Sequence, residues 1–322
     1  MNGWLILDKP LGLGSTQGVS AVKRALRAGG YAKCKVGHGG TLDPLATGVL
    51  PIALGEATKL AGRMLDASKV YAFTIGFGTE TETLDAEGEG SATSDVRPTL
   101  AQIDAVLPRF TGPIEQIPPK YSALKIDGKR AYDLARAGVE VEMKTRRVTI
   151  ESLTVSPEPV EGRLSDENRA SISSALTEDG SSDDRRELES ITLIAHVSKG
   201  TYIRSLARDI ARALDTVGHV TMLRRLRAGP FALDSAISLD RLAELGQGAA
   251  LEEALLPIEA GLDDIPALTL TPGEAEAVRQ GRFLSGIAAD DGLTWARGPD
   301  GIPVALVQIE GGDLRIVRGF NL

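Results

Sequence analysis

A glycine-rich segment around a single carboxylate constrains this chain more than any other stretch of its sequence. Residues 37–50 read Gly-His-Gly-Gly-Thr-Leu-Asp-Pro-Leu-Ala-Thr-Gly-Val-Leu, and Asp43 is the acidic residue among them. Glycine permits positive φ and close approach of a ligand, while Pro44 restricts the backbone of Asp43. An isolated Leu-Asp-Pro is usually an ordinary surface turn. The whole segment instead predicts a stiff turn that presents the Asp43 carboxylate just before a buried strand.

Hydrophobic periodicity along the rest of the chain indicates an α+β fold with a mainly antiparallel sheet flanked by helices. Apolar runs and alternation predict strands at 4–7, 49–54, 70–77, 148–155, 191–197 and 220–226. Helical spacing predicts a helix that Ser15 and Thr16 cap and that Gly29 ends, a helix after Thr58, and helices at about 99–109, 129–137 and 202–214.

Two breaks divide the chain. Residues 157–190 are rich in Ser, Asp and Glu and poor in large apolar side chains, so they cannot bury enough surface to order themselves. We predict that they form a disordered acidic insert between two strands. A second break, at 261–266, separates a large domain over 1–260 from a small β-rich domain over 266–322.

The charge of the chain is unevenly distributed. The net charge is -8, from 36 Lys and Arg against 44 Asp and Glu. Acidic residues concentrate in 157–190 and 231–322, whereas basic residues outnumber acidic ones over 1–156 and 191–230. A basic face of this kind is compatible with RNA binding, although it is also common on surfaces that bind nothing.

The sequence excludes several classes of protein. No apolar stretch approaches the roughly 20 residues that a membrane-spanning helix needs. The first residues lack the basic start and the cleavage site of a secretory signal. The single cysteine, Cys34, can neither pair within the chain nor build a zinc site alone. We therefore expect a cytoplasmic protein.

Five sequence blocks, in this order, resemble the TruB family of tRNA pseudouridine synthases. They are 37–50 with its continuation to residue 60, 69–85, 116–125, 200–209 and 223–227. The resemblance covers most of 3–156 and 190–235, and the acidic insert lies outside it. Residues 270–275 and 279–281 are similar to the PUA-like carboxy-terminal domain of the family. The resemblance implies a pseudouridine synthase fold with such a domain appended.

The activity that this resemblance implies is the conversion of uridine 55 in the T-loop of tRNA to pseudouridine. The isomerisation breaks the N1 to C1′ bond, turns the uracil and joins C5 to C1′, so it needs neither a metal nor a redox cofactor. The expected partner is the T-arm stem-loop of tRNA. We expect a monomer with no obligatory protein partner and no membrane contact.

The resemblance also assigns catalytic roles to three residues. Asp43 is the catalytic carboxylate, acting either as a nucleophile or as the base for an elimination. Arg204 is expected to pair with Asp43 and keep it ionised. Tyr71 is expected to stack on the uracil and handle its C5 proton. Without the resemblance, Arg204 would be interpreted as a surface arginine and Tyr71 as a core residue of a strand.

Substrate-binding residues follow from the same resemblance. His38 is expected to fill or brace the space that the flipped uridine vacates, and Tyr202 and Leu223 to form further walls of the pocket beside Gly40 and Thr41. The cations expected to contact phosphates are Lys59, Lys125, Lys129, Arg130, Arg146 and Arg147, of which the last five flank a thumb-like segment at about 115–147.

Two other classes of function remain open at this point. An RNA chaperone with the same fold could bind tRNA and help it to fold without needing catalysis. A metal-dependent hydrolase could use His38 and Asp43 as ligands, but the sequence places no acidic cluster beside them, which argues against this hypothesis.

We predict that deleting residues 160–188 leaves turnover nearly unchanged, because the deletion falls between two strands and outside every block of the resemblance. The rate of pseudouridine formation on tRNA transcript, compared between the deletion variant and the intact chain, checks this. A large loss of turnover would show that the insert is placed wrongly.

Overall fold

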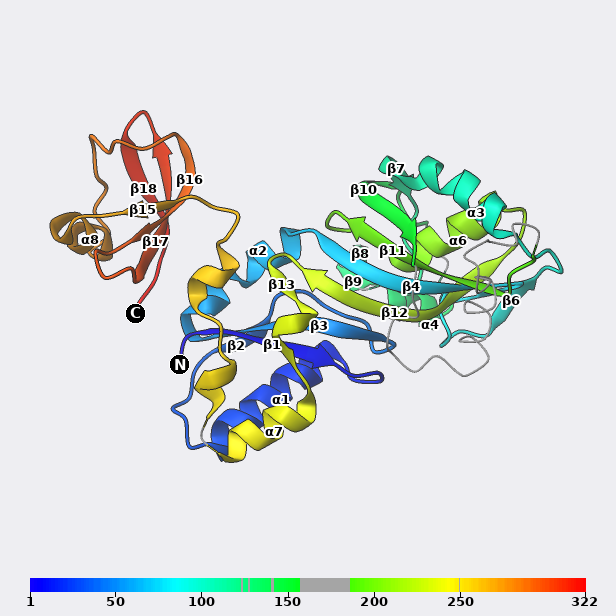
Figure 1. Cartoon of the computed structure of the whole chain (residues 1–322), viewed down its shortest axis with the longest axis horizontal. Helices are drawn as coiled ribbons and strands as arrows, with labels where there is room; N and C mark the ends of the chain where they lie inside the picture. The colour runs from blue at the N-terminus through cyan, green and yellow to red at the C-terminus, as the bar shows by residue number, and fades with distance from the viewer. Residues whose placement is uncertain (123, 127, 140–141, 157–185, 249) are drawn as a thin grey trace, which may run out of the picture.

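The computed structural model describes residues 1–122, 124–126, 128–139, 142–156, 186–248 and 250–322. Within these residues, a ten-stranded sheet runs through the larger domain (Figure 1). Its main path is β14 (Ala236–Ile237), β1 (Gly3–Lys9), β3 (Ala46–Leu54), β12 (Gly218–Ala228), β4 (Lys69–Phe77), β11 (Ser190–Val197), β10 (Arg146–Val155) and β7 (Gly112–Gln116), with β13 (Phe231–Ala232) beside β12 and β2 (Val36–His38) beside β3.

The predicted α+β fold and its mainly antiparallel sheet are confirmed, with one refinement. Strand β12 pairs with β3 in parallel, and β1 pairs with β14 in parallel, while the other strand pairs of this sheet are antiparallel. The sheet is therefore mixed. The parallel pairing of β3 with β12 joins the two halves of the sheet at its centre.

Helices cover the sheet in two groups because their apolar residues recur at helical spacing. Helix α1 (Ser15–Ala28) and α7 (Leu239–Gln247) pack together over β1 and β3. Helix α6 (Ile203–Ala213), with α3 (Leu100–Val106) and η2 (Leu107–Phe110), covers the half of the sheet that contains β4, β11 and β10. No described helix is both long enough and apolar enough to cross a lipid bilayer.

The remaining elements of the larger domain are short. They are η1 (Gly55–Leu60), α2 (Ala61–Asp66), β5 (Thr79–Thr81), β6 (Gly90–Thr93), β8 (Lys125–Ile126), β9 (Lys129–Arg130), α4 (Ala131–Arg136), η3 (Leu233–Ser235), η4 (Leu251–Ala254) and η5 (Ile258–Gly261). Strands β8 and β9 form a hairpin that precedes α4, and this hairpin and helix lie within the predicted thumb-like segment.

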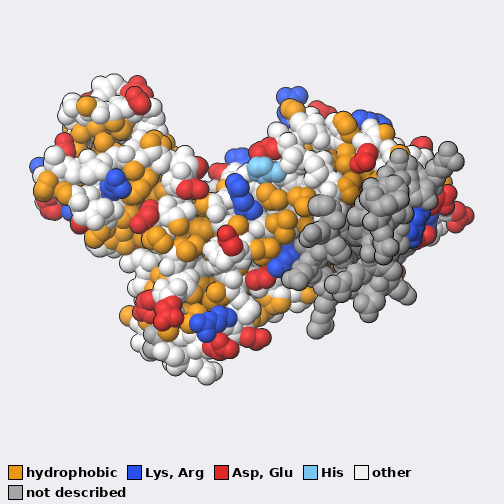
Figure 2. Space-filling model, viewed as in Figure 1, with side chains coloured by type: hydrophobic (Ala, Val, Ile, Leu, Met, Phe, Trp, Pro, Cys, Tyr) orange, Lys and Arg blue, Asp and Glu red, His pale blue; other side chains and the backbone are white. Residues whose placement is uncertain are grey.

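The predicted β-rich carboxy-terminal domain is confirmed. It contains a four-stranded sheet of β15 (Ala267–Thr269), β16 (Gly292–Arg297), β17 (Pro303–Glu310) and β18 (Asp313–Gly319), with α8 (Pro272–Arg279) against it. Trp295, Leu306 and Phe320 share a buried cluster with Trp4 of β1, so apolar packing joins the two domains. Figure 2 shows carboxylates on the visible face of this domain, which has seven Asp and Glu against five Lys and Arg over 266–322.

The carboxyl end of the predicted acidic insert is wrong. Residues 157–185 lie outside the described part of the chain, but Leu188 is 4% exposed and packs in the cluster under α6. Its amide donates to the Pro98 carbonyl at 2.9 Å, and β11 already begins at Ser190. Glu189 is held as well, because it forms an ion pair with Arg97 at 2.6 Å and its carbonyl accepts from the Phe77 amide. A deletion that tests the insert should therefore end at residue 185.

The predicted start of the first helix is also corrected. The N-cap residue is Gly14, whose amide donates to the Gln17 side chain at 2.7 Å. Ser15 makes no capping hydrogen bond, because its hydroxyl is engaged by the backbone of Leu42. Ser15 therefore fixes the loop at Leu42 instead of capping the helix.

Gly48 is required where β3 meets β12. Its φ is +99°, and a Cβ atom there would lie 2.2 Å from the Arg225 carbonyl oxygen. The Arg225 backbone could not move away from such a Cβ atom without breaking the parallel pairing of β3 with β12. Gly62, in α2, has a non-strained φ and open space around it.

We expect Gly48→Ala to lower the free energy of unfolding by about 2–3 kcal/mol, because it adds both backbone strain and a clash with main-chain atoms. The matched control, Gly62→Ala, should raise it by about 0.5–1 kcal/mol through higher helix propensity. Urea unfolding of the two variants measures both values. Equal tolerance of the two changes would contradict the geometry at Gly48.

Candidate active site

A cavity of about 340 Å³ brings together half of the residues that the sequence singles out. The predicted residues that line it are Gly40, Thr41, Asp43, Tyr71, Tyr202, Arg204 and Leu223. They come from the loop after β2, from β4, from the start of α6 and from β12. Segments far apart in the sequence therefore converge on one small hollow beside the Asp43 carboxylate.

Asp43 and Arg204 form an ion pair at the edge of this cavity. Arg204 Nη2 lies 3.0 Å from Asp43 Oδ2, so the predicted pairing is present. The Arg204 side chain is 10% exposed, whereas the Asp43 side chain is 49% exposed. The guanidinium is held inside the protein, and the carboxylate opens toward the space where a ligand would sit.

Asp85 holds the opposite side of the Arg204 guanidinium. Arg204 Nη1 lies 3.1 Å from Asp85 Oδ2 and donates to the Thr83 carbonyl at 3.0 Å. Asp85 is in turn fixed by the Thr83 hydroxyl and by the Glu87 amide. Sequence reasoning missed this role, although the acidic end of the block at 69–85 was a signal for it. One buried cation thus lies between two carboxylates.

The backbone of the Asp43 loop is held from below by Lys9 and Ser15. The fully buried Lys9 ammonium donates to the carbonyls of Leu13 at 2.6 Å and of Pro44 at 3.2 Å. The Ser15 hydroxyl lies 2.8 Å from the amide and 2.9 Å from the carbonyl oxygen of Leu42. The residues on both sides of Asp43 are therefore fixed, which leaves its side chain little freedom to move away.

Arg225 holds the other arm of the same loop. This side chain is 1% exposed, and it donates to the carbonyls of Val49 at 2.7 Å, Thr41 at 3.3 Å and Gly40 at 3.4 Å. Sequence reasoning placed Arg225 within a block of the resemblance but gave it no role. Its position shows that the glycine-rich loop is built around a buried guanidinium.

Lys69, at the start of β4, is a further cation that lines the cavity. Its ammonium donates to the carbonyls of Met64, Leu65 and Ala67, at distances from 2.6 to 2.9 Å. Burial lowers the pKa of Lys69 to about 8. Its carbonyl partners leave its positive charge unneutralised, so it adds to the positive potential around the cavity.

Tyr71 and Leu223 form apolar walls of the cavity. Tyr71 in β4 is half-buried and packs against the cluster under α6, and Leu223 in β12 does the same. Tyr202 enters from the other side, where its amide donates to the Gln116 side chain at 2.8 Å. Burial raises the pKa of the Tyr202 phenol, so its hydroxyl is neutral near neutral pH.

His38 and Lys59 are not among the residues that line the cavity. His38 is half-buried in β2, and burial, with the nearby Arg225 charge, lowers its pKa. Lys59 forms an ion pair with Glu56 at 2.6 Å and donates to the Gly319 carbonyl at 2.8 Å. The described residues contain no group of three or more His, Cys, Asp and Glu arranged to hold a metal ion.

The basic residues of the thumb-like segment lie outside the cavity. Lys129, Arg130, Arg146 and Arg147 are exposed, and the Lys125 side chain lies outside the described part of the structure. Arg146 is near enough for its charge to act on Tyr202. Arg146 therefore stands near the thumb side of the cavity.

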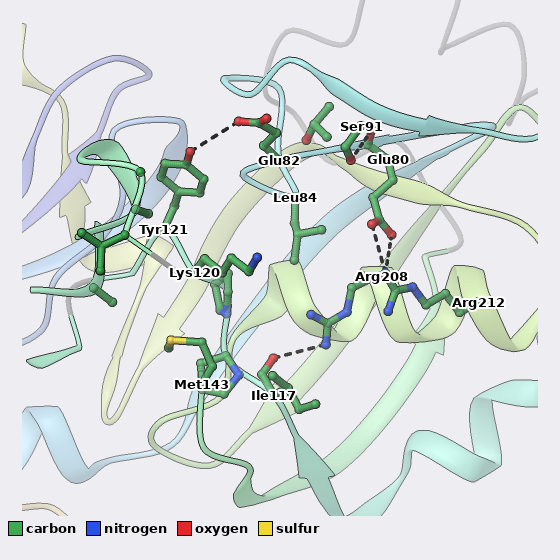
Figure 3. Close-up of a pocket in the computed structure, with 17 residues that line it drawn as sticks. Glu80, Glu82, Leu84, Ser91, Ile117, Lys120, Tyr121, Met143, Arg208 and Arg212 are labelled. Atoms are coloured by element: carbon green, nitrogen blue, oxygen red, sulfur yellow. Dashed lines mark hydrogen bonds and ion pairs between the residues drawn. The ribbon is translucent and has the colours of Figure 1, made fainter. Parts of the chain in front are cut away.

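A second cavity, of about 770 Å³, lies between the thumb-like segment and α6 (Figure 3). Arg208 reaches across it and donates to the Ile117 carbonyl at 3.2 Å, and the Tyr121 hydroxyl donates to Glu82 at 3.3 Å. These bonds tie the first part of the thumb-like segment to the body of the domain.

The burial of Lys9 predicts that the free energy of unfolding depends on pH. Burial lowers the pKa of its ammonium to about 8, against about 10.5 in the unfolded chain. Between these values the unfolded chain holds a proton that the folded chain has released, so this residue makes the free energy of unfolding rise with pH. Urea unfolding at about pH 7.5 and about pH 9.5 should show the wild type gaining stability relative to Lys9→Met. A difference between the two proteins that does not change with pH would refute the assignment.

Solved structures of other proteins share this fold. A chain of the archaeal box H/ACA sRNP Nop10-Cbf5 complex has a TM-score of 0.67 at 22% identity, over 99% of this chain and 86% of that chain. A chain of a Cbf5-Nop10-Gar1 complex has a TM-score of 0.69 at 24% identity, over 99% of this chain and 85% of that chain.

Curated relatives match the whole chain. A Novosphingobium aromaticivorans protein named tRNA pseudouridine synthase B is 63% identical to this chain, over 100% of this chain and 98% of the relative. A Zymomonas mobilis protein of the same name is 54% identical, over 100% of this chain and 96% of the relative. Residues 24–165 match the TruB family pseudouridylate synthase N-terminal domain. Residues 204–263 match the tRNA pseudouridylate synthase B C-terminal domain, and residues 265–321 match the tRNA pseudouridine synthase II C-terminal domain. The chain belongs to the TruB family of pseudouridylate synthases.

Proposed function

We propose that this chain isomerises a uridine of tRNA to pseudouridine, with Asp43 as its catalytic carboxylate. The observation that carries the proposal is the half-exposed Asp43 carboxylate, held 3.0 Å from the buried Arg204 guanidinium at a small cavity with aromatic walls. The curated relatives, named tRNA pseudouridine synthase B, support the same reaction and substrate.

The cavity suits a single base. Its volume of about 340 Å³ is at the lower end of the range for small-molecule sites, which fits one flipped pyrimidine rather than a duplex. Extracting a uridine from a folded loop costs about a few kcal/mol, which stacking on Tyr71 and contact with Leu223 would offset. The substrate would then lie with its ribose near Asp43.

The chemistry requires an ionised Asp43 within a poorly hydrated site. Asp43 would act as a nucleophile or as the base for an elimination while the N1 to C1′ bond breaks. Arg204 stabilises the carboxylate, and Asp85 stabilises Arg204 from its other side. After the uracil turns, C5 joins C1′, C5 loses its proton and N1 takes up a proton in its place. Tyr71 is the phenol beside this step. The atoms of substrate and product are the same.

Finer features of the function extend the proposal. We propose that the target is uridine 55, that the T arm is held by the thumb-side cations, and that His38 braces the vacated space behind Gly40. We also propose that the protein acts as a monomer with no obligatory protein partner, in the cytoplasm where tRNA is processed. The catalytic unit would span 1–260 and the appended PUA-like unit 266–322.

Product formation on unmodified tRNA transcript tests the reaction. We expect the wild type to form pseudouridine, and to form none when cytidine replaces the target uridine.

Asp43→Asn keeps the shape of the side chain but removes its charge, so product should fall by about 10³-fold or more with tRNA binding retained. Asp85→Asn acts only through Arg204 and should reduce kcat by about 10- to 100-fold with little change in KM.

A chaperone predicts different results in this experiment. Wild-type protein that binds the transcript and refolds it, yet forms no pseudouridine, would overturn the catalytic proposal. Equal product from wild type and Asp43→Asn would leave the reaction in place but remove Asp43 from it.

A further inference from the structure

The chain between Asp8 and Asp43 contains basic side chains and no acidic one. Its basic residues are Lys9, Lys23, Arg24, Arg27, Lys33 and Lys35. The whole chain carries a net charge of -8, so the net positive charge of this stretch is opposite to that of the protein. Lys9 is buried beneath the Asp43 loop, whereas the other five are exposed. The stretch therefore presents positive charge to solvent.

Two of these charges lie one turn apart on α1. The apolar residues of this helix face the core, which leaves Lys23 and Arg27 as exposed neighbours at a spacing of four positions. Like charges at this spacing weaken a helix. Among the described residues, no carboxylate lies within ion-pair distance of either side chain or of Lys33. Helix stability does not explain this arrangement.

The same side chains border a hollow of about 860 Å³ beyond the end of α1. Lys23, Arg27, Lys33 and Lys35 line it, and none of its described lining residues is Asp or Glu. The cavity beneath the thumb-like segment differs, because two glutamates line it. Lys35 lies within electrostatic range of Glu56, so its charge is partly balanced. The Glu252 carboxylate accepts from Tyr31 at the edge of the hollow. Lys23, Arg27 and Lys33 have no ion-pair partner among the described residues.

This hollow adjoins the candidate active site through β2. Gly37 lines the hollow and Gly40 lines the cavity at Asp43, and three residues span at most about 11 Å. Helix α1 lies in the half of the larger domain nearer the carboxy-terminal domain, while β8, β9 and α4 of the thumb-like segment lie in the other half (Figure 1). An RNA held in the cavity from the thumb side would have to cover only this short distance along β2 to reach the hollow.

We propose that Lys23, Arg27 and Lys33 bind backbone phosphates of the tRNA outside its T arm. The proposal rests on the proposed function and adds a second contact region to it. A polyanion fits these observations better than a single small anion, because the cations are exposed, have no ion-pair partner among the described residues and surround a wide hollow. Such contacts fix the position of an RNA without reading its sequence.

The test compares two RNAs. The variant Lys23→Gln/Arg27→Gln/Lys33→Gln and the wild type are titrated with full-length tRNA transcript and with the isolated T-arm hairpin, at several salt concentrations. We expect the variant to bind full-length tRNA about tenfold or more weakly, with the slope of log Kd against log salt reduced by about 3. Binding and turnover of the hairpin should be unchanged, which also shows that the variant is folded.

The matched control is Arg109→Gln/Arg241→Gln/Arg279→Gln. It removes the same charge from exposed positions that line neither hollow nor cavity, and it should bind both RNAs as the wild type does. A loss as large in this control would assign the effect to net charge and overturn the proposal.

Two further outcomes would also overturn it. Equal weakening on both RNAs would place these cations on the T arm, and unchanged binding of both would make them solvated surface charges. Failure of the proposed function is distinguishable, because it would appear as absence of pseudouridine with the wild type on either RNA, whatever the variant does to binding.

Discussion

The ion pair between Asp43 and Arg204 is the contact on which the rest of the site depends. A guanidinium as buried as that of Arg204 loses its hydration, and it is stable there only because Asp43, Asp85 and the Thr83 carbonyl surround it. Removing one carboxylate would leave a buried charge only partly compensated. The glycine-rich loop, the turn before β6 and the first turn of α6 must therefore all be in place before the site exists.

A second constraint comes from the buried cations around the Asp43 loop and its cavity. Lys9, Arg225 and Lys69 donate to main-chain carbonyls. Carbonyl partners fix the backbone geometry but do not cancel the positive charges. The loop that Lys9 and Arg225 hold is consequently rigid and electropositive at once, which favours the approach of a polyanion.

Much of this arrangement could be predicted from the sequence, because strands with strong apolar patterns and a fourteen-residue motif around Asp43 are local signals. The predictions that were wrong or missed all concern contacts between residues far apart in the sequence. Ser15 at a helix start looks like a cap, and only the fold shows that Leu42 occupies its hydroxyl. Leu188 follows an acidic run, so its burial depends on a core that no local window contains. The role of Asp85 required knowledge of where α6 places Arg204, and the pairing of Lys59 with Gly319 required the position of the second domain.

The position of β1 in the sheet has a consequence for biosynthesis. The first strand of the chain pairs with β14, its Trp4 indole donates to the Ile258 carbonyl, and Trp4 shares a cluster with Trp295. None of these partners exists until most of the chain has left the ribosome, and contacts so distant in sequence form slowly. The amino-terminal strand must therefore wait, with its apolar side chains incompletely covered, so the nascent chain depends on protection from aggregation until synthesis is nearly complete.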